Sequence, residues 1–301
     1  MTEPTVRALT HTTSSGLRIT ADLWPGSGGH TVVLLHGGGQ TRHAWTGTAR
    51  ALVREGHTAI PVDLRGHGDS GWAPDGDYEL DAIAGDIASL CEELGTKPVL
   101  VGASLGGITG LMLEGAVAPG SLSALVLVDI VPRMNIVGAN RIVDFMAERM
   151  DDGFATLDEV ADTIAAFNPN RPRPTDLSGL TKNLRERNGR WYWHWDPAFI
   201  RAARGASEQR QIRNPQLLTD TLQQVDVPLL LVRGRQSDLV TDDEVEEFRR
   251  EFPHAAFHDV VGAGHMVAGD RNDAFSAAVV DFIAGVPQPE SDSIPSPAQE
   301  N

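Results

Sequence analysis

The chain has 301 residues, of which 41% are hydrophobic and 22% are charged, and these values are ordinary for a soluble globular protein. Its formal net charge of -16 argues against nucleic-acid binding and against an anionic membrane surface, because both need clustered Lys and Arg. A single cysteine, Cys91, excludes an internal disulfide. The N-terminus shows no signal segment and no apolar run reaches the roughly 20 residues of a membrane span, so we expect a cytoplasmic protein.

Strand-like and helix-like segments alternate along most of the chain. Two alternating segments, 6–14 and 17–25, predict an antiparallel hairpin at a sheet edge. Strands are then predicted at 31–38, 58–66, 98–104, 123–131, 227–234 and 255–265, and helices at 45–56, 78–95, 105–116, 241–252 and 272–285. Near-continuous Val, Leu and Ile runs are typical of strands covered on both faces. The pattern predicts an α/β fold with a mostly parallel central sheet.

This alternation stops between residues 131 and 216. The segment is helix-prone, rich in Arg and Asn, and lacks a strand run comparable to those before it. We interpret 131–216 as a helical cap inserted into a core formed by 1–130 and 217–286, because neither flank alone has a complete sheet. The last residues, 287–301, are rich in Pro, Ser and acids and are expected to be disordered.

A serine lies between glycines in the stretch VLVGASLGG, where a predicted strand ends and a predicted helix begins. Gly102 and Gly106 flank Ser104 in a G-x-S-x-G pattern, which alone is a weak signal. In the strand–turn–helix context, however, a sharp turn would expose the Ser104 hydroxyl at the carboxyl end of the strand. The helix N-terminus would favour developing negative charge there. We predict that Ser104 is a nucleophile.

A serine nucleophile requires a base and a group that orients the base. His265, in the glycine-rich stretch VVGAGHMV, is the candidate base. Asp238 and Asp129 each follow a predicted strand and are rival candidates for the orienting acid. Of the two we favour Asp238, and the chain order Ser, Asp, His is that of a hydrolase with a nucleophile elbow.

The oxyanion formed on attack requires two preorganised N–H donors. The residue after the nucleophile, Leu105, would supply one of them. The stretch HGGG would supply the other, because its glycines let the backbone approach a substrate closely, and we predict the Gly38 N–H.

The motifs LHGGGQTRHAW, VDLRGHGDS, VGASLGG, GRQSDLV and GAGHMV, in this order, resemble those of the α/β-hydrolase superfamily, and the resemblance extends over residues 15–285. The most similar branch is that of the haloperoxidases and epoxide hydrolases, which includes cofactor-free esterases and carbon–carbon bond hydrolases. The resemblance implies triad roles for Ser104, Asp238 and His265, and a scaffold role for the DxRGxGxS stretch at 63–70. Epoxide hydrolases and haloalkane dehalogenases have aspartate at the elbow, so neither activity is expected here.

The segment NGRWYWHWDP at 188–197 concentrates aromatic residues. They either pack the cap onto the core or line an apolar substrate pocket. The candidate pocket residues are His36, Gly39, Trp191, Trp193, Trp195 and Met266. His36 also fits a second role, as a hydrogen-bonding scaffold residue beside the glycines.

We therefore expect a cofactor-free serine hydrolase that cleaves an ester, thioester or lactone of a small hydrophobic molecule. No His, Asp and Glu grouping has metal-ligand spacing, so no metal is expected. Carbon–carbon bond hydrolysis of a vinylogous diketone and perhydrolysis use the same triad and remain alternatives. A ligand-binding or receptor protein on the same fold is an alternative of another class. The sequence leaves the oligomeric state open, a homodimer included.

Overall fold

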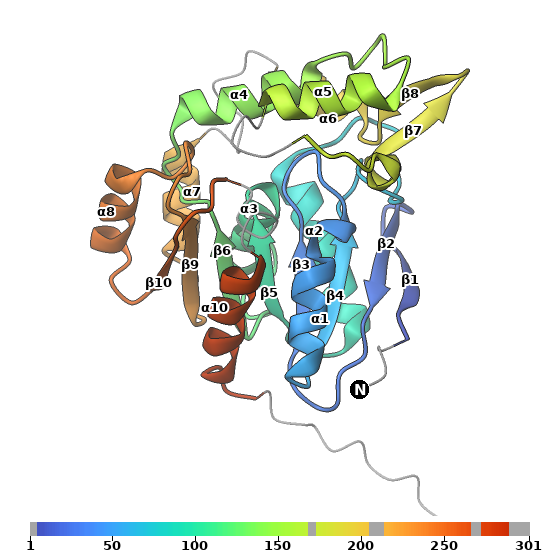
Figure 1. The fold of residues 1–301 in the computed structure, drawn as a ribbon. Coiled ribbons are helices and arrows are strands. Elements are labelled where there is room, and N and C mark those ends of the chain that lie inside the picture. The colour runs from blue at the N-terminus through green and yellow to red at the C-terminus, as the bar shows by residue number, and fades with distance from the viewer. Residues whose placement is uncertain (1–4, 168–172, 205–213, 266–271, 289–301) are drawn as a thin grey trace, which may run out of the picture.

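The computed structural model describes residues 5–167, 173–204, 214–265 and 272–288, and its centre is a sheet of eight strands in the order β1-β2-β4-β3-β5-β6-β9-β10 (Figure 1). The strands are β1 (Arg7–Thr12), β2 (Arg18–Leu23), β3 (Thr31–Leu35), β4 (Thr58–Asp63), β5 (Val99–Ala103), β6 (Ala124–Val128), β9 (Leu229–Gly234) and β10 (Ala256–Val260). All neighbours from β4 to β10 pair in parallel. The expected α/β class and its mostly parallel sheet are confirmed.

The predicted N-terminal hairpin is also confirmed. β1 and β2 pair antiparallel from Arg7 opposite Leu23 to Thr12 opposite Arg18. β2 then pairs antiparallel with β4, so the hairpin forms one edge of the sheet. β3 lies between β4 and β5 in the sheet, although both of these strands come after it in the chain. The order of the strands therefore reverses direction at β3. In such sheets, ligands bind at the carboxyl end of the strands at this switch point.

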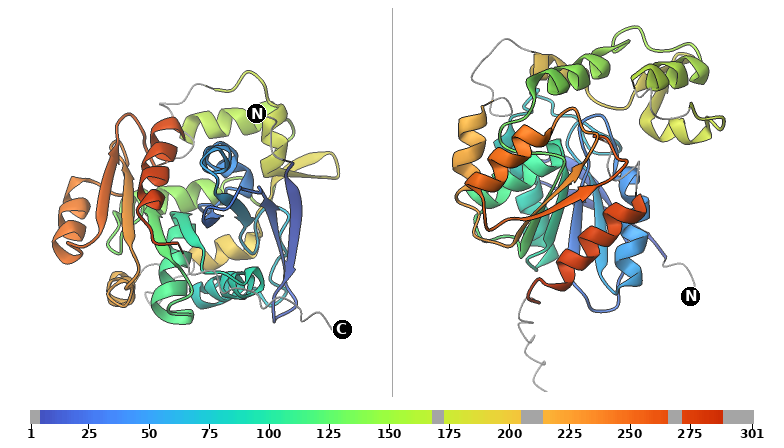
Figure 2. Two further views of the ribbon diagram at one scale, coloured as in Figure 1. Left: turned by 90° about the horizontal axis from the view of Figure 1, so that it is seen from below. Right: turned by 60° about the vertical axis from the view of Figure 1, so that its left-hand side comes forward.

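Helices cover both faces of this sheet (Figures 1 and 2). α1 (Thr46–Arg54) and α10 (Asn272–Ala284) pack on one face together with strand residues such as Val101 and Val126. α2 (Leu80–Leu94), α3 (Leu105–Met112), α7 (Pro215–Leu222) and α8 (Asp242–Glu251) pack with the alternate strand residues, such as Leu100 and Leu125. Apolar side chains on both faces of the strands explain their unbroken hydrophobic runs.

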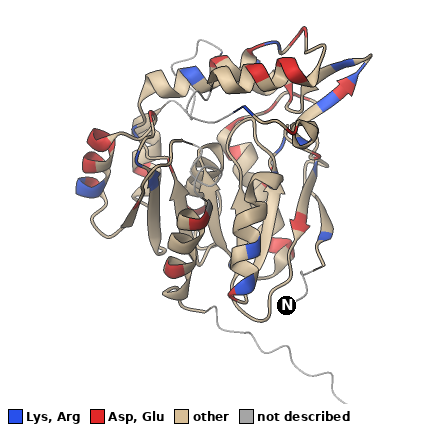
Figure 3. Ribbon diagram, in the orientation of Figure 1, with Lys and Arg blue, Asp and Glu red and all other residues tan. Residues whose placement is uncertain are grey.

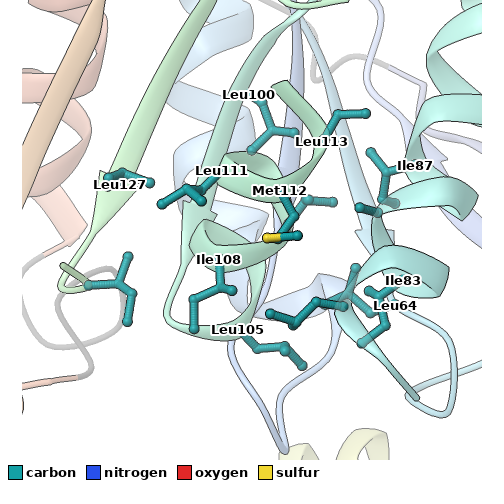
Figure 4. Close-up of a cluster of buried hydrophobic side chains, with 14 of the residues drawn as sticks. Leu64, Ile83, Ile87, Leu100, Leu105, Ile108, Leu111, Met112, Leu113 and Leu127 are labelled. Carbon is teal, nitrogen blue, oxygen red and sulfur yellow. The ribbon is translucent and has the colours of Figure 1, made fainter. Parts of the chain in front are cut away.

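α3 is buried around its whole circumference, which suits its apolar sequence LGGITGLM. In Figure 4, Leu105, Ile108 and Met112 of this helix lie among Ile83 and Ile87 of α2 and neighbouring strand residues. One turn of π-helix, Leu113–Val117, extends α3. The dense packing holds the N-terminus of α3 rigidly at the carboxyl end of β5.

A second layer lies over the carboxyl ends of the strands (Figure 1). Its elements are α4 (Ile136–Ala147), α5 (Leu157–Phe167), a 3-10 helix (Ser178–Asn183), β7 (Leu184–Arg187), β8 (Arg190–Trp193) and α6 (Pro197–Arg204). We refer to residues 131–204 of the described chain as the cap. α7 packs against α3, so the predicted cap–core boundary at residue 216 falls inside a helix of the core.

The expected helical cap also contains β-structure, because β7 and β8 form an antiparallel hairpin. Asn188 and Gly189 connect the two strands and both have positive φ, 52° and 74°. An Asn-Gly pair in this conformation is typical of a two-residue hairpin turn. The aromatic run RWYW then forms β8 instead of a helix.

Charged residues lie mostly on the outer elements, notably α8, the cap helices and the β7–β8 hairpin, whereas the central strands and α3 carry few (Figure 3). Within the described residues, no helix combines the length and the apolar character needed to cross a membrane. Of the predicted tail, residues 289–301 lie outside the described residues.

Candidate active site

Ser104 lies at the sharp turn between β5 and α3. Its φ of 48° and ψ of -113° are strained for a residue with a side chain. The neighbouring glycines are required, because a Cβ at Gly102 would lie 2.3 Å from the Gly106 carbonyl oxygen and one at Gly106 would lie 2.3 Å from the Leu35 carbonyl oxygen. The turn therefore holds Ser104 at the carboxyl edge of the sheet.

His265 follows β10 and donates a hydrogen bond from Nδ1 to Oδ2 of Asp129, at 2.7 Å. Asp129 directly follows β6 and is fully buried, whereas the His265 side chain is 18% exposed. The bond fixes the ring and leaves Nε2 as the nitrogen available for proton transfer. The loop that carries His265 is seated close to β9, since a Cβ at Gly234 would lie 2.1 Å from the Gly264 carbonyl oxygen.

The buried carboxylate of Asp129 has two further donors. The Ser237 hydroxyl donates to Oδ2 at 2.5 Å, and the Gly234 N–H donates to Oδ1 at 3.1 Å. Together with His265, these donors compensate for the loss of hydration that burial imposes on a carboxylate. Asp129 itself has a φ of 52°, a left-handed conformation tolerated by aspartate.

The preference for Asp238 as the partner of His265 is wrong in this structure. The Asp238 carboxylate, 48% exposed, pairs with Arg141 of α4 at 2.7 Å. The loop after β9 turns so that Ser237 faces Asp129 while Asp238 faces the cap. Both acids follow neighbouring strands, β6 and β9, and the sequence pattern gives no side-chain direction that would separate them. Ser237 was missed because an isolated serine beside a favoured aspartate gives no signal of its own.

The glycine loop after β3 lies against Ser104. A Cβ at Gly37 would be 3.4 Å from Cβ of Ser104. The Gly37 carbonyl accepts hydrogen bonds from Nδ1 of His36 at 2.8 Å and from the N–H of Gln40 at 3.1 Å. Because this carbonyl belongs to the same peptide unit as the Gly38 N–H, the two bonds contribute to the direction in which that N–H points.

Leu105, the second predicted oxyanion donor, is the first residue of α3. The N–H groups of a first helical turn have no intrahelical acceptor, and the helix dipole favours negative charge near them. The first turn of α3 and the glycine loop therefore both lie next to the Ser104 turn.

His36 is a scaffold residue and not a pocket residue in this structure. Its fully buried ring bridges two loops, donating to the Gly37 carbonyl and accepting from the Leu64 N–H at 3.1 Å. Burial lowers the pKa of His36, although the nearby Asp63 acts in the opposite direction. The lowered pKa keeps the imidazole neutral. The described residues that line the neighbouring cavity do not include it.

A cavity of about 510 Å³ lies between the glycine loop and the cap, and His265 lines it. Gly38, Gly39, Trp193 and Trp195 line it as well. The other apolar lining residues come mainly from the cap: Ile142, Phe145, Met146, Ile164, Phe167 and Leu180. The volume falls within the range of small-molecule sites, and the lining favours an apolar ligand.

Two aromatic stacks form much of this wall. The rings of Trp193 and Trp195 stack at 4.8 Å, and those of Phe145 and Phe167 stack at 4.2 Å. Trp191, predicted for the pocket, instead pairs through its backbone with Phe154 inside the cap and does not line the described cavity. Met266 lies outside the described residues.

The described part of the chain brings together no three His, Cys, Asp or Glu side chains in an arrangement that could hold a metal ion. The groups that meet at this edge of the sheet are a strained serine, an imidazole on a buried carboxylate, and backbone N–H groups. This set can perform proton transfer and stabilise an oxyanion without a bound ion.

Known proteins share both the sequence pattern and the fold of this chain. A family model described as the alpha/beta hydrolase fold matches residues 30–271. Esterase Rv0045c of Mycobacterium tuberculosis is 32% identical over 279 residues, covering 89% of this chain and 86% of that protein. Its solved structure superposes with a TM-score of 0.72 at 30% identity, over 94% of this chain and 93% of the other.

Two further relatives differ in their named activities. The mouse sn-1-specific diacylglycerol lipase ABHD11 is 29% identical, over 84% of this chain and 80% of that protein. The non-heme chloroperoxidase CPO-A1 of Kitasatospora aureofaciens is 27% identical, over 90% of this chain and 98% of that protein. The similarity therefore extends over most of the chain in each case.

Proposed function

The chain belongs to the alpha/beta hydrolase fold family, and on that premise we propose that it is a serine hydrolase of esters with Ser104, His265 and Asp129 as its catalytic triad. The observation that carries the proposal is the hydrogen bond from His265 to the buried carboxylate of Asp129, at the edge where the strained turn presents Ser104. The esterases and the lipase among its relatives support ester hydrolysis as the reaction.

In this mechanism, Nε2 of His265 takes the hydroxyl proton while Oγ of Ser104 attacks the ester carbonyl. The negative charge that develops on the carbonyl oxygen is stabilised by the N–H groups of Gly38 and Leu105. Collapse of the tetrahedral intermediate transfers the proton from His265 to the departing alcohol and leaves an acyl group on Ser104. A water molecule, deprotonated by His265, then releases the acid.

The substrate proposed is a small hydrophobic ester whose apolar part occupies the cavity beneath the cap. The aromatic wall of Trp193 and Trp195 and the aliphatic side chains of α4 and α5 support this choice. Apolar burial supplies binding energy but little geometric discrimination, so we expect a graded preference along a series of acyl chain lengths.

The test is hydrolysis of p-nitrophenyl esters from acetate to laurate by the wild type and by Ser104→Ala. We expect a Ser104-dependent rate with an optimum at intermediate or long chains, and a loss on the order of 10⁶-fold in turnover in the variant if the triad acts as a unit. Turnover near the wild-type rate in Ser104→Ala would refute the mechanism.

A further inference from the structure

The cap lies directly on the glycine loop that carries the proposed oxyanion donor. A Cβ at Gly38 would lie 3.4 Å from the sulfur of Met146, and one at Gly39 would lie 3.3 Å from the Trp195 ring. Nearby, the Thr41 hydroxyl donates to the Asn183 side-chain oxygen at 3.2 Å. The loop is therefore in contact with three separate parts of the cap.

The cap residue His194 makes a further hydrogen bond to this loop, directly to its glycine backbone. Its Nδ1 accepts from the Gly68 N–H at 2.8 Å, and its Nε2 donates to the Gly39 carbonyl at 3.3 Å. Because a backbone N–H can only donate, the proton of the neutral ring must reside on Nε2. The ring is fully buried, and burial together with His67 and His36 holds the pKa of His194 well below its ordinary value.

His36 and His194 thus bracket the Gly38 residue. His36, from the end of β3, donates to the carbonyl on one side of it, and His194, from the cap, donates to the carbonyl on the other side. Each imidazole also accepts an N–H from the loop after β4, at Leu64 and at Gly68. A run of three glycines has no side chains of its own to hold its conformation, so it depends on these bonds together with those between Gln40 and Gly37.

We propose that His194 is a positioning residue, which holds the Gly39 carbonyl so that the Gly38 N–H points at the oxyanion only when the cap is seated. This inference rests on the proposed function, since it assigns an oxyanion role to Gly38. It adds that the core alone does not complete the oxyanion hole. A displacement of about 1 Å in such a donor is sufficient to lower a rate by up to about 100-fold.

Two substitutions separate the two bonds of His194. The His194→Gln side chain reaches far enough to retain a donor near the Gly39 carbonyl, whereas His194→Asn retains an acceptor near the Gly68 N–H but is too short to reach Gly39. A purely structural role would make the two variants similar. Tyr78→Phe serves as the control, because Tyr78 donates to Asp196 of the same cap segment at 2.5 Å and does not touch the glycine loop.

The measurements are the rate at which a fluorophosphonate labels Ser104, kcat and KM for one p-nitrophenyl ester, and the thermal midpoint of each variant. The phosphoryl oxygen of the probe occupies the oxyanion position, so labelling reports the hole without a known substrate. We expect His194→Asn to lose roughly 10- to 100-fold in labelling rate and kcat with little change in KM, and His194→Gln to retain most of both. Tyr78→Phe should remain within about threefold of the wild type.

Equal labelling rates in the wild type and His194→Asn would overturn the inference and leave the proposed function standing. Equal losses in the Asn, Gln and Tyr78→Phe variants would also overturn it, because general loosening of the cap would then explain the effect. A wild type that the probe does not label, or labels no faster than Ser104→Ala, would refute the proposed function and the inference together.

Discussion

At the scale of single residues, the position of one carboxylate decides the composition of the proposed triad. The Asp129 carboxylate is buried and accepts hydrogen bonds from His265, Ser237 and Gly234. The Asp238 carboxylate is half-exposed and forms an ion pair with Arg141. The sequence allowed Ser104, His265 and the rivalry between the two acids to be predicted. Which acid reaches the imidazole depends on how two loops at neighbouring strand ends turn, and short-range sequence patterns do not determine that direction.

The paired variants Asp129→Asn and Asp238→Asn test this assignment. An amide in place of the buried carboxylate favours the wrong imidazole tautomer and removes the charge that stabilises the imidazolium, so we expect Asp129→Asn to lose on the order of 10⁴-fold in kcat/KM. Asp238→Asn should remain within about threefold, because it alters only an exposed ion pair. The reverse order of effects in ester hydrolysis would restore Asp238 as the acid.

At the scale of elements, close contacts through glycines fix how the cap sits on the core. The apolar runs and the Gly-x-Ser-x-Gly pattern predicted the strands and the Ser104 turn correctly, because steric limits at the turn act over a few residues. The β7–β8 hairpin was missed although the Asn188–Gly189 pair carries its turn signal. The aromatic run after that turn gives no alternation of polar and apolar residues, so its β-structure follows from pairing within the cap.

Gly138 of α4 provides a test of the cap–core contact. A Cβ there would lie 2.5 Å from the Asp238 carbonyl oxygen, so Gly138→Ala must displace α4. This helix contributes Ile142, Phe145 and Met146 to the cavity wall. We expect the ratio of kcat/KM for laurate to that for acetate to fall severalfold, because the longer acyl chain depends more on this wall.

The matched control is Gly85→Ala in α2. A Cβ at Gly85 meets nothing within 4 Å, and alanine there should stabilise the helix by up to about 1 kcal/mol without moving the cavity wall. Its chain-length profile is therefore expected to match that of the wild type. If the chain-length profile of Gly138→Ala matched those of the wild type and of Gly85→Ala, the position of α4 would not determine the chain-length preference.

At the scale of the whole molecule, three buried histidines join the cap, the glycine loop and the loop after β4. His67 lies between the other two, with ring centroids 5.1 Å from His36 and 5.8 Å from His194. Burial, reinforced by His36, lowers the pKa of His67 to about 3, and its Nε2 has no hydrogen-bond partner among the described residues. The cap, the core and the glycine loop thus depend on one set of neutral imidazoles.

This arrangement predicts a loss of stability in mild acid. The unfolded chain protonates each histidine near pH 6.5, while the folded protein does so only at lower pH. The unfolded state therefore binds more protons just below pH 6.5, and the free energy of unfolding falls as the pH falls. Each histidine that stays neutral contributes a slope of up to about 1.4 kcal/mol per pH unit below this value.

The variant His67→Phe isolates one of these contributions, because it keeps an aromatic ring against Phe199, whose centroid lies 4.9 Å from that of His67, and removes the titrating group. The other ionisable groups are present in both proteins, and burial, the largest cause of the low pKa of His194, is retained in the variant, so the difference between their stability–pH curves is assigned to His67. Denaturant unfolding at pH 7 and pH 5 should show the wild type losing about 2 kcal/mol more than the variant over this interval. Parallel losses in the two proteins would mean that His67 binds protons equally in the folded and unfolded states. His67 would then not contribute to the loss of stability in mild acid.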